Sequence, residues 1–217
     1  MRVNTKIIGV SVDLRRLHMA SDGDFNRKSF TTDHTGFGVP FAVNPKRTDV
    51  PRNAARPFRY MDRYLRVSQG EVFYATELLA ALEGIERGPA GNTSLAAALK
   101  LARELPEDNV VVQETEYTGA GKHPTVRLTF AKDMGIEIRR GNPRGNLPGK
   151  KIIIPQTFAD LSYEEYPLQD LKKKRIENAV QGSKTKLQDY EVQFLAEEVK
   201  ADTAFVMKAQ RETTHPQ

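Results

Sequence analysis

The chain has 217 residues, and a hydrophobic content of 39% is enough for a core in one large domain or two small ones. It contains no cysteine, which excludes a disulfide framework, a thiolate metal site and a cysteine nucleophile within it. The formal net charge of +5 is compatible with an anionic or acidic partner, and the absence of a long apolar run predicts a cytoplasmic protein without a membrane span.

The N-terminal part combines an apolar strand with an irregular, basic segment. Residues 6–12 (KIIGVSV) form a mostly apolar run, which predicts a buried parallel strand. Residues 18–57 are rich in Gly, Pro, Asp, Thr and Asn, which predicts a long irregular excursion. Six arginines then recur every three to five residues, at Arg47, Arg52, Arg56, Arg59, Arg63 and Arg66. The run is typical of a solvated basic loop and helix face, with an anionic ligand or an acidic partner chain as the alternatives.

Two helices follow, each with a recognisable stop. Residues 74–83 (YATELLAALE) have helical spacing of apolar residues and end at Gly84. Residues 92–94 (Asn-Thr-Ser) offer capping side chains before a second helix at 95–104, which Pro106 closes.

The next elements complete an α/β pattern. The β-branched run at 109–113 predicts a strand, and a glycine-containing loop follows it. Residues 125–134 predict a helix that Gly135 stops, and residues 136–138 predict a short strand. This order of helix, strand, glycine loop, helix and strand predicts a layered α/β sheet.

The C-terminal part changes character at about residue 150. Residues 140–150, with three glycines and two prolines, predict a linker or crossing loop before the apolar run at 152–154. Charged, amphipathic, helix-favouring segments follow at 168–180 and 186–208. We therefore divide the chain into an α/β part at residues 1–150 and a helical extension at residues 151–217.

The loop at residues 117–124 (YTGAGKHP) is the strongest candidate for chemistry. Ligands of open α/β sheets bind at the carboxyl ends of strands, where glycines let backbone N–H groups approach closely. A tight turn without a ligand is the alternative. Lys122 and His123 could bind an anion or transfer a proton, or simply be solvated. The sequence has no P-loop and no dinucleotide fingerprint, and its histidines lack paired metal-ligand spacing, so we expect no metal.

Several segments together resemble one enzyme family more specifically than any does alone. They are EGI at 83–85, GPAGNTSLA at 88–96, LPED at 105–108, VVV at 110–112 and TGAG at 118–121. In this order they resemble the C-terminal part of the cofactor domain of fold-type II pyridoxal-phosphate enzymes, the group of tryptophan synthase β and threonine synthase. The resemblance covers roughly residues 6–140 and implies an open twisted sheet and pyridoxal 5'-phosphate as the cofactor.

The resemblance also assigns roles to particular positions. It implies that Thr118 faces the pyridine nitrogen, that Gly119 and Gly121 shape this loop, and that Glu83 and Gly84 line the ring and substrate side. For Glu83, a solvated carboxylate at a helix end is the alternative. In the family the Schiff-base lysine and the phosphate cup precede the region matched here, so the resemblance places both upstream of Met1. We therefore expect no catalytic residue in this chain, and no activity from it alone.

Within that family, residues 115–124 and 127–132 are most similar to the β subunits of thiolases that cleave 2-amino-4-oxopentanoate with coenzyme A, giving acetyl-CoA and alanine in ornithine degradation. The similarity implies an α subunit, an N-terminal portion of the same enzyme, or both as partners, within an oligomer. Two alternatives stay open. One is a threonine-synthase-like lyase. The other is a non-enzymatic module whose arginines contact an acidic protein or nucleic acid, although no RNA-binding or zinc-finger signature accompanies them.

Overall fold

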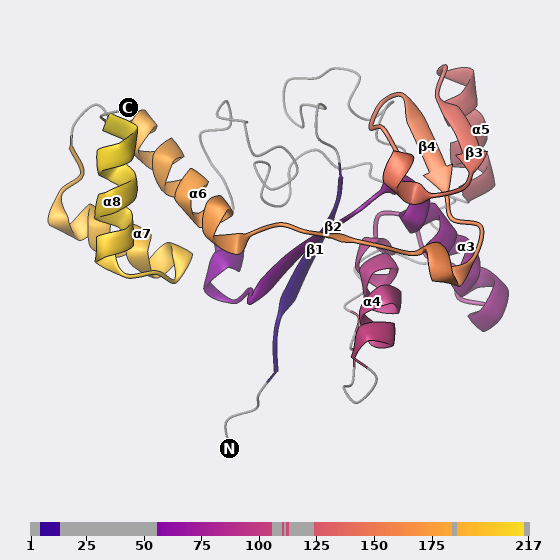
Figure 1. Ribbon diagram of the computed structural model, residues 1–217, viewed down its shortest axis with the longest axis horizontal. Coiled ribbons are helices and arrows are strands. Elements are labelled where there is room, and N and C mark those ends of the chain that lie inside the picture. The colour runs from indigo at the N-terminus through magenta and orange to yellow at the C-terminus, as the bar shows by residue number, and fades with distance from the viewer. Residues whose placement is uncertain are drawn as a thin grey trace. The chain divides into compact units, whose positions relative to one another are not determined.

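The computed structural model describes residues 5–13, 56–105, 110, 112, 124–183 and 186–214. Its elements in chain order are β1 (Ile8–Val12), η1 (Arg56–Arg59), β2 (Arg63–Val67), α3 (Gln69–Glu83), α4 (Thr93–Glu104), α5 (Pro124–Asp133), β3 (Glu137–Arg140), η2 (Pro143–Gly145), β4 (Lys151–Ile154), η3 (Phe158–Asp160), β5 (Glu164–Glu165), α6 (Leu168–Gly182), α7 (Asp189–Val199) and α8 (Thr203–Thr214) (Figure 1). The predicted excursion at 18–57 and strand at 109–113 lie almost entirely outside the described residues.

The chain forms two compact units. The first comprises Met1–Gly9, Phe37–Tyr64 and Tyr166–Gln217, and the second comprises Val10–Gly36 and Leu65–Glu165. The described part contains two open sheets, with strand orders β1-β2-β5 and β3-β4, and the C-terminal region is helical. The predicted α/β class with a helical C-terminal region is therefore confirmed.

Strands β1 and β2 run parallel. The Ile7 carbonyl accepts a hydrogen bond from the Asp62 N–H at 2.8 Å, and the Val67 carbonyl accepts one from the Asp13 N–H at 2.7 Å, so both strands advance in the same direction. The prediction of a parallel strand at 6–12 is thus confirmed for Ile8–Val12, but the strand is buried only at Val12, and the other four residues of β1 are partly exposed. On its other edge β2 pairs antiparallel with the short strand β5.

Helix α3 packs against β4 in the second unit. Phe73 of α3 and Ile152 and Ile154 of β4 share one core cluster with Ala131 of α5. The approach is close because α3 presents Gly70 there: a Cβ on Gly70 would lie 1.7 Å from the Ile153 carbonyl oxygen. Strands β3 and β4 pair in parallel, although only residues 141–150 connect them. The predicted crossing loop at 140–150 is therefore real, and it contains the short turn η2.

Helix α4 begins at Thr93, two residues before the predicted start at 95, and this start is stabilised differently from the prediction. The Asn92 side chain makes no capping bond. Its amide donates to the Thr76 hydroxyl at 3.0 Å, because Asn92 is fully buried between α4 and α3. The Thr93 hydroxyl donates back to the Ala90 carbonyl at 2.8 Å. The prediction that these side chains cap the helix is wrong, since they brace the preceding loop instead.

Helices α6, α7 and α8 form a bundle in the first unit (Figure 1). The sequence predicts a continuous helical segment at 186–208, and the structure divides it into two helices. Lys200 ends α7 in the left-handed conformation, with φ of 52°. The buried Lys172 ammonium donates to the Lys200 carbonyl at 3.0 Å, so α6 contributes a donor to the end of α7. Burial, followed by the nearby Lys200 charge, lowers the pKa of Lys172.

Replacing Gly70 by alanine should be strongly destabilising, because the new methyl group would overlap the Ile153 backbone and force α3 away from β4. We expect a loss of at least about 2 kcal/mol in unfolding free energy, as for other overpacked sites. Gly182→Ala is the matched control, since nothing lies within 4 Å of its Cβ position. Equal melting temperatures for the two variants in thermal denaturation would contradict the close α3–β4 packing.

Candidate functional site

Two of the residues predicted to line the cofactor lie at the C-terminal end of α3. Gly84 adopts the left-handed conformation, with φ of 65°, and its N–H donates to the Ala80 carbonyl at 3.1 Å. The helix stop predicted at Gly84 is confirmed, and glycine suits it because a Cβ disfavours this conformation. Glu83 is exposed beside it. The other predicted residues, Thr118, Gly119, Gly121, Lys122 and His123, lie outside the described part of the chain.

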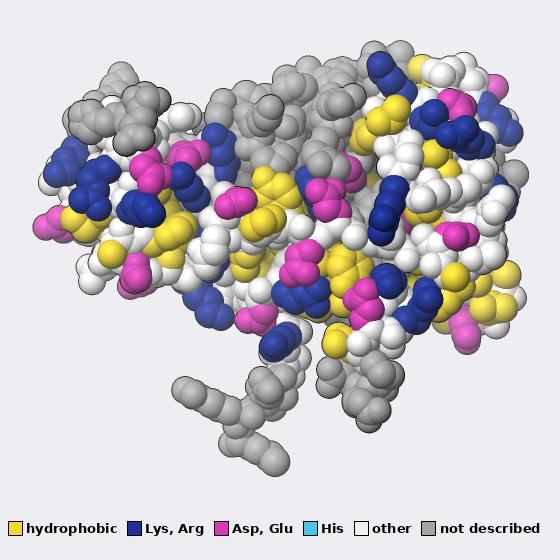
Figure 2. Space-filling view, viewed as in Figure 1, with side chains coloured by type: hydrophobic (Ala, Val, Ile, Leu, Met, Phe, Trp, Pro, Cys, Tyr) yellow, Lys and Arg dark blue, Asp and Glu magenta, His cyan; other side chains and the backbone are white. Residues whose placement is uncertain are grey.

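The surroundings of Glu83 and Gly84 are apolar and open. Leu82 is 71% exposed and Ile85 is 43% exposed. Figure 2 shows hydrophobic side chains gathered over this end of α3. The described residues therefore form an open apolar surface here and no enclosure.

A half-open cavity lies at the opposite end of α3. A cavity of about 380 Å³ is lined by residues that include Arg66, Ser68, Glu71, Arg144, Ser162 and Glu164. Glu71 and Glu83 are twelve residues apart on α3, and at a rise of 1.5 Å per residue that places them about 18 Å apart. The cavity and the predicted cofactor wall are therefore separate features of the second unit.

Glu71 organises the cavity wall. One carboxylate oxygen accepts from the Ser68 N–H at 2.7 Å, and the other accepts from the Ser162 N–H at 2.7 Å and the Ser162 hydroxyl at 2.8 Å. The Ser68 hydroxyl in turn accepts from the Glu71 N–H at 3.2 Å, which completes a capping box. Burial raises the pKa of the Glu71 carboxyl, although the hydrogen bonds from Ser68 and Ser162 act in the opposite direction.

The amino-acid sequence of this region matches a known family. Residues 2–116 match the model of pyridoxal-phosphate dependent enzymes, which is more than half of the chain. The chain belongs to this family. Its cofactor is thus pyridoxal phosphate, as the sequence analysis predicted, and the matched region includes β1, β2, α3 and α4.

Two curated relatives are closely similar. A 2-amino-4-ketopentanoate thiolase beta subunit from an unknown prokaryotic organism is 62% identical over 211 residues, which cover 96% of this chain and 45% of that protein. A protein of the same name from Acetoanaerobium sticklandii is 55% identical over 204 residues, covering 93% of this chain and 44% of that protein. The chain spans less than half the length of these relatives. No solved structure matches it.

The described lining of the cavity contains no lysine, the residue type whose amine holds pyridoxal phosphate covalently. The described residues at the other end of α3, which include Glu83 and Gly84, form an open surface.

The arginine run separates into residues with different surroundings. Arg66 lies in β2 with only 2% of its surface exposed, and its guanidinium forms an ion pair of 2.7 Å with Glu164. Arg63 is partly buried in the same strand, whereas Arg59 is exposed in η1. The prediction that these arginines lie on a solvated loop and helix face is wrong for Arg66, because Arg66 lies in strand β2 and its side chain is buried. Arg47 and Arg52 lie outside the described residues.

The sequence analysis missed the Glu71 cluster, although a signal was present. It placed the start of the helix at residue 74, whereas α3 begins at Gln69. Ser68 and Glu71 have the Ser-x-x-Glu spacing of a capping box, which marks a helix start. Ser162 carries no comparable signal, because it meets Glu71 only through the fold.

Among the described residues, no helix combines the length and the apolar character needed to traverse a lipid bilayer.

Replacing Glu71 by glutamine should change the stability of the protein little at acid pH, because a protonated carboxyl and an amide each place one donor group among the N–H groups of Ser68 and Ser162. Since the folded-state pKa of Glu71 is raised, the carboxyl contributes stability fully below its ordinary value of 4.5 and loses that contribution as the pH rises through the folded value. The stability of the native protein relative to Glu71→Gln should therefore fall as the pH rises, by about 1 kcal/mol for each unit of difference between the folded and unfolded pKa.

Thermal melting of both proteins between about pH 4 and pH 7 measures this difference. Glu191→Gln is the matched control, since Glu191 forms the capping box of α7 with Gln188 at 2.7 Å and lies outside the cavity. A difference between native protein and Glu71→Gln that does not change with pH would contradict the assigned direction of the pKa shift.

Proposed function

We propose that the chain is part of a pyridoxal-phosphate-dependent thiolase that cleaves 2-amino-4-oxopentanoate with coenzyme A, giving acetyl-CoA and alanine. The observation that carries the proposal is the identity of 62% and 55% to two thiolase beta subunits over nearly the whole chain. Relatives of that name favour a thiolase over a threonine-synthase-like lyase or a non-enzymatic module.

The proposed chemistry fits the composition of the chain. Thiolases with a cysteine nucleophile need a residue that this chain does not contain. A bound pyridoxal cofactor supplies an electron sink for the carbanion that remains on the alanine fragment after carbon–carbon cleavage. The acetyl group is transferred to the coenzyme A sulfur, and a proton completes the alanine methyl group.

The site that we propose combines two segments of this chain. Thr118 would face the pyridine nitrogen, with Gly119 and Gly121 shaping its loop. Glu83 and Gly84 would line the ring and substrate side, and their exposed position at the end of α3 supports a role as one wall of a site completed by other polypeptide. The Schiff-base lysine would come from outside this chain.

We further propose that the chain acts with additional polypeptide. The thiolase relatives are more than twice its length, and their name as beta subunits implies an alpha subunit. Activity then requires the remaining portion of the enzyme, the α subunit or both, within an oligomer. The division of the chain into an α/β part at residues 1–150 and a helical extension at residues 151–217 stays a prediction.

Reconstitution tests the proposal. The chain alone should show neither the visible absorbance of bound pyridoxal phosphate nor acetyl-CoA formation from 2-amino-4-oxopentanoate. Addition of the remaining portion and the α subunit should produce both, and borohydride reduction with peptide mapping should place the cofactor-bound lysine outside this chain. A trapped lysine within the chain, or turnover by the chain alone, would contradict the split site.

In the reconstituted enzyme, Thr118→Ala should lower cofactor affinity roughly tenfold, because one hydrogen bond to the pyridine nitrogen is lost. Thr203→Ala, at an exposed position of α8, is the control and should bind the cofactor normally. Affinity follows from titration of the visible band. Equal affinities for the two variants would remove Thr118 from the site.

A further inference from the structure

The turn between α3 and α4 is exposed where it begins and buried where it ends. It starts at Gly84, directly after Glu83, and it ends at Asn92, the residue before α4. Residues 84–86 are exposed, whereas residues 88, 89, 91 and 92 are buried. The two helices on either side of it pack against each other (Figure 1). The turn therefore leads from the open end of α3 to a packed part of the second unit.

Asn92 connects three parts of this unit. Its side chain is fully buried, and its amide group donates to the Thr76 hydroxyl of α3 at 3.0 Å and to the Gly88 carbonyl of the turn at 3.4 Å. Its backbone carbonyl accepts from the Ala96 N–H at 3.0 Å, at the start of α4. One residue thus holds α3, the turn and α4 in a defined arrangement.

The Thr76 hydroxyl can receive this hydrogen bond because its own proton is already used. Thr76 is 3% exposed, and its hydroxyl donates to the Val72 carbonyl at 2.8 Å. A hydroxyl has one proton and two acceptor lone pairs, so its oxygen faces Asn92 as an acceptor. Residue 92 must therefore supply a donor, as the amide of asparagine does.

The burial of Asn92 is not explained by stability alone. Its Oδ1 atom is buried, and no described residue donates a hydrogen bond to it. A buried acceptor without a donor costs free energy, and an apolar side chain at this position would avoid that cost. Such atoms are uncommon in folded proteins and call for a specific reason. The positions that the amide group holds supply that reason.

The hydrogen bond to Thr76 lies close to the predicted cofactor wall. Thr76 and Glu83 are seven residues apart on α3, which corresponds to about 10 Å along the helix axis. Because residues 84–86 are exposed, their path depends mainly on the two points that hold the turn, namely the end of α3 and Asn92. A displacement of about 1 Å in a binding site can lower function on the order of a hundredfold.

We propose that Asn92 is a positioning residue of the cofactor site, which holds Glu83, Gly84 and the turn after them in the geometry that the cofactor requires. Asn92 is fully buried, so it acts through the turn and not by touching the ligand. The inference rests on the proposed function in one respect, namely that Glu83 and Gly84 line the cofactor. It does not depend on which substrate the enzyme cleaves.

The test uses the complete β chain, which is this chain together with the remaining portion of the enzyme. Thr76→Val removes the hydroxyl that accepts from Asn92, and it should lower the affinity for pyridoxal phosphate roughly tenfold, as the loss of one hydrogen bond does. Thr76→Ser keeps the hydroxyl and should bind the cofactor with near-native affinity. Asn92→Ala should match Thr76→Val, and the double variant should lose no more, since both changes break one contact. Titration of the visible band measures affinity.

Thr213→Val is the matched control. The Thr213 hydroxyl donates to the Ala209 carbonyl at 2.8 Å, as the Thr76 hydroxyl does to the Val72 carbonyl, but Thr213 lies in α8 of the first unit. This variant loses an equivalent bond to the fourth preceding residue and should bind the cofactor normally.

Hydrogen exchange of the complete β chain without cofactor gives a second measurement, which is independent of cofactor binding and of turnover. The amides of residues 85–91 should exchange faster in Thr76→Val and Asn92→Ala than in the native protein, because the turn loses the contact at its buried end. In Thr213→Val they should exchange at the native rate. If Asn92→Ala does not fold, the comparison of Thr76→Val with Thr76→Ser is sufficient.

Three results would overturn the inference. Native exchange in the turn of both variants would show that Asn92 does not hold it. Faster exchange with native cofactor affinity would show that the position of the turn does not matter to the site. An equal loss of affinity in Thr213→Val would assign the effect to general destabilisation. If the variants behave as expected but the native complex does not cleave 2-amino-4-oxopentanoate, the proposed function alone is refuted.

Discussion

The second unit depends on one buried carboxylate. Glu71 lies almost wholly inside the protein, and the cost of removing it from water is offset by donors from Ser68 and Ser162, which are 94 residues apart in the chain. This network starts α3 at a defined residue and joins it to the loop after β4. Once that end is anchored, the close contact at Gly70 fixes α3 on β4. The position of Glu83, twelve residues and about three turns away, follows from the rigidity of the helix.

The two ends of α3 are consequently unlike in their chemistry. The N-terminal end has paired polar groups around a cavity, whereas the C-terminal end exposes Leu82 and Ile85 beside Gly84. At the polar end Glu71 accepts hydrogen bonds from within the chain, whereas the apolar end faces water. The chain spans less than half of the longer relatives. The open end of α3 is therefore where we propose that other polypeptide completes a site.

Local signals predicted the elements that depend on local chemistry. Gly84 and Gly135 stop α3 and α5 because each adopts a positive φ, of 65° and 78°, that other residues disfavour. The sequence did not predict the features that depend on tertiary contacts. An arginine is usually found at the surface, but the ion pair that Arg66 of β2 forms with Glu164 of β5 permits its burial. The break at Lys200 is equally invisible in the sequence, since an amine from another helix satisfies its carbonyl.

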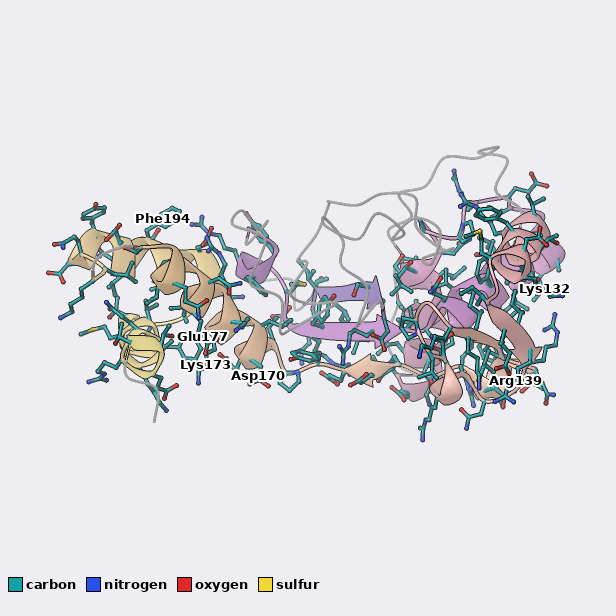
Figure 3. The ribbon with its side chains drawn as sticks, turned by 90° about the horizontal axis from the view of Figure 1, so that it is seen from above. Lys132, Arg139, Asp170, Lys173, Glu177 and Phe194 are labelled. Carbon is teal, nitrogen blue, oxygen red and sulfur yellow. The ribbon has the colours of Figure 1, made fainter. Side chains whose placement is uncertain are left out.

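Ion pairing also explains why the total charge of the chain is a poor guide to its partners. Residues 172–175 of α6 are a run of four basic residues. In the bundle Lys173 contacts Glu212, and Arg175 contacts Glu198 at 2.9 Å. Figure 3 shows Lys173 and Glu177 on α6, which also form an ion pair, at 4.0 Å. These cations serve to hold helices together, and exchange with an external anion would break those contacts. Residues 124–155 hold seven basic and two acidic residues, and Arg140 there pairs at 3.4 Å with Glu77 of α3. The distribution of carboxylates in the fold, more than the number of cations in a segment, therefore determines which cations are paired.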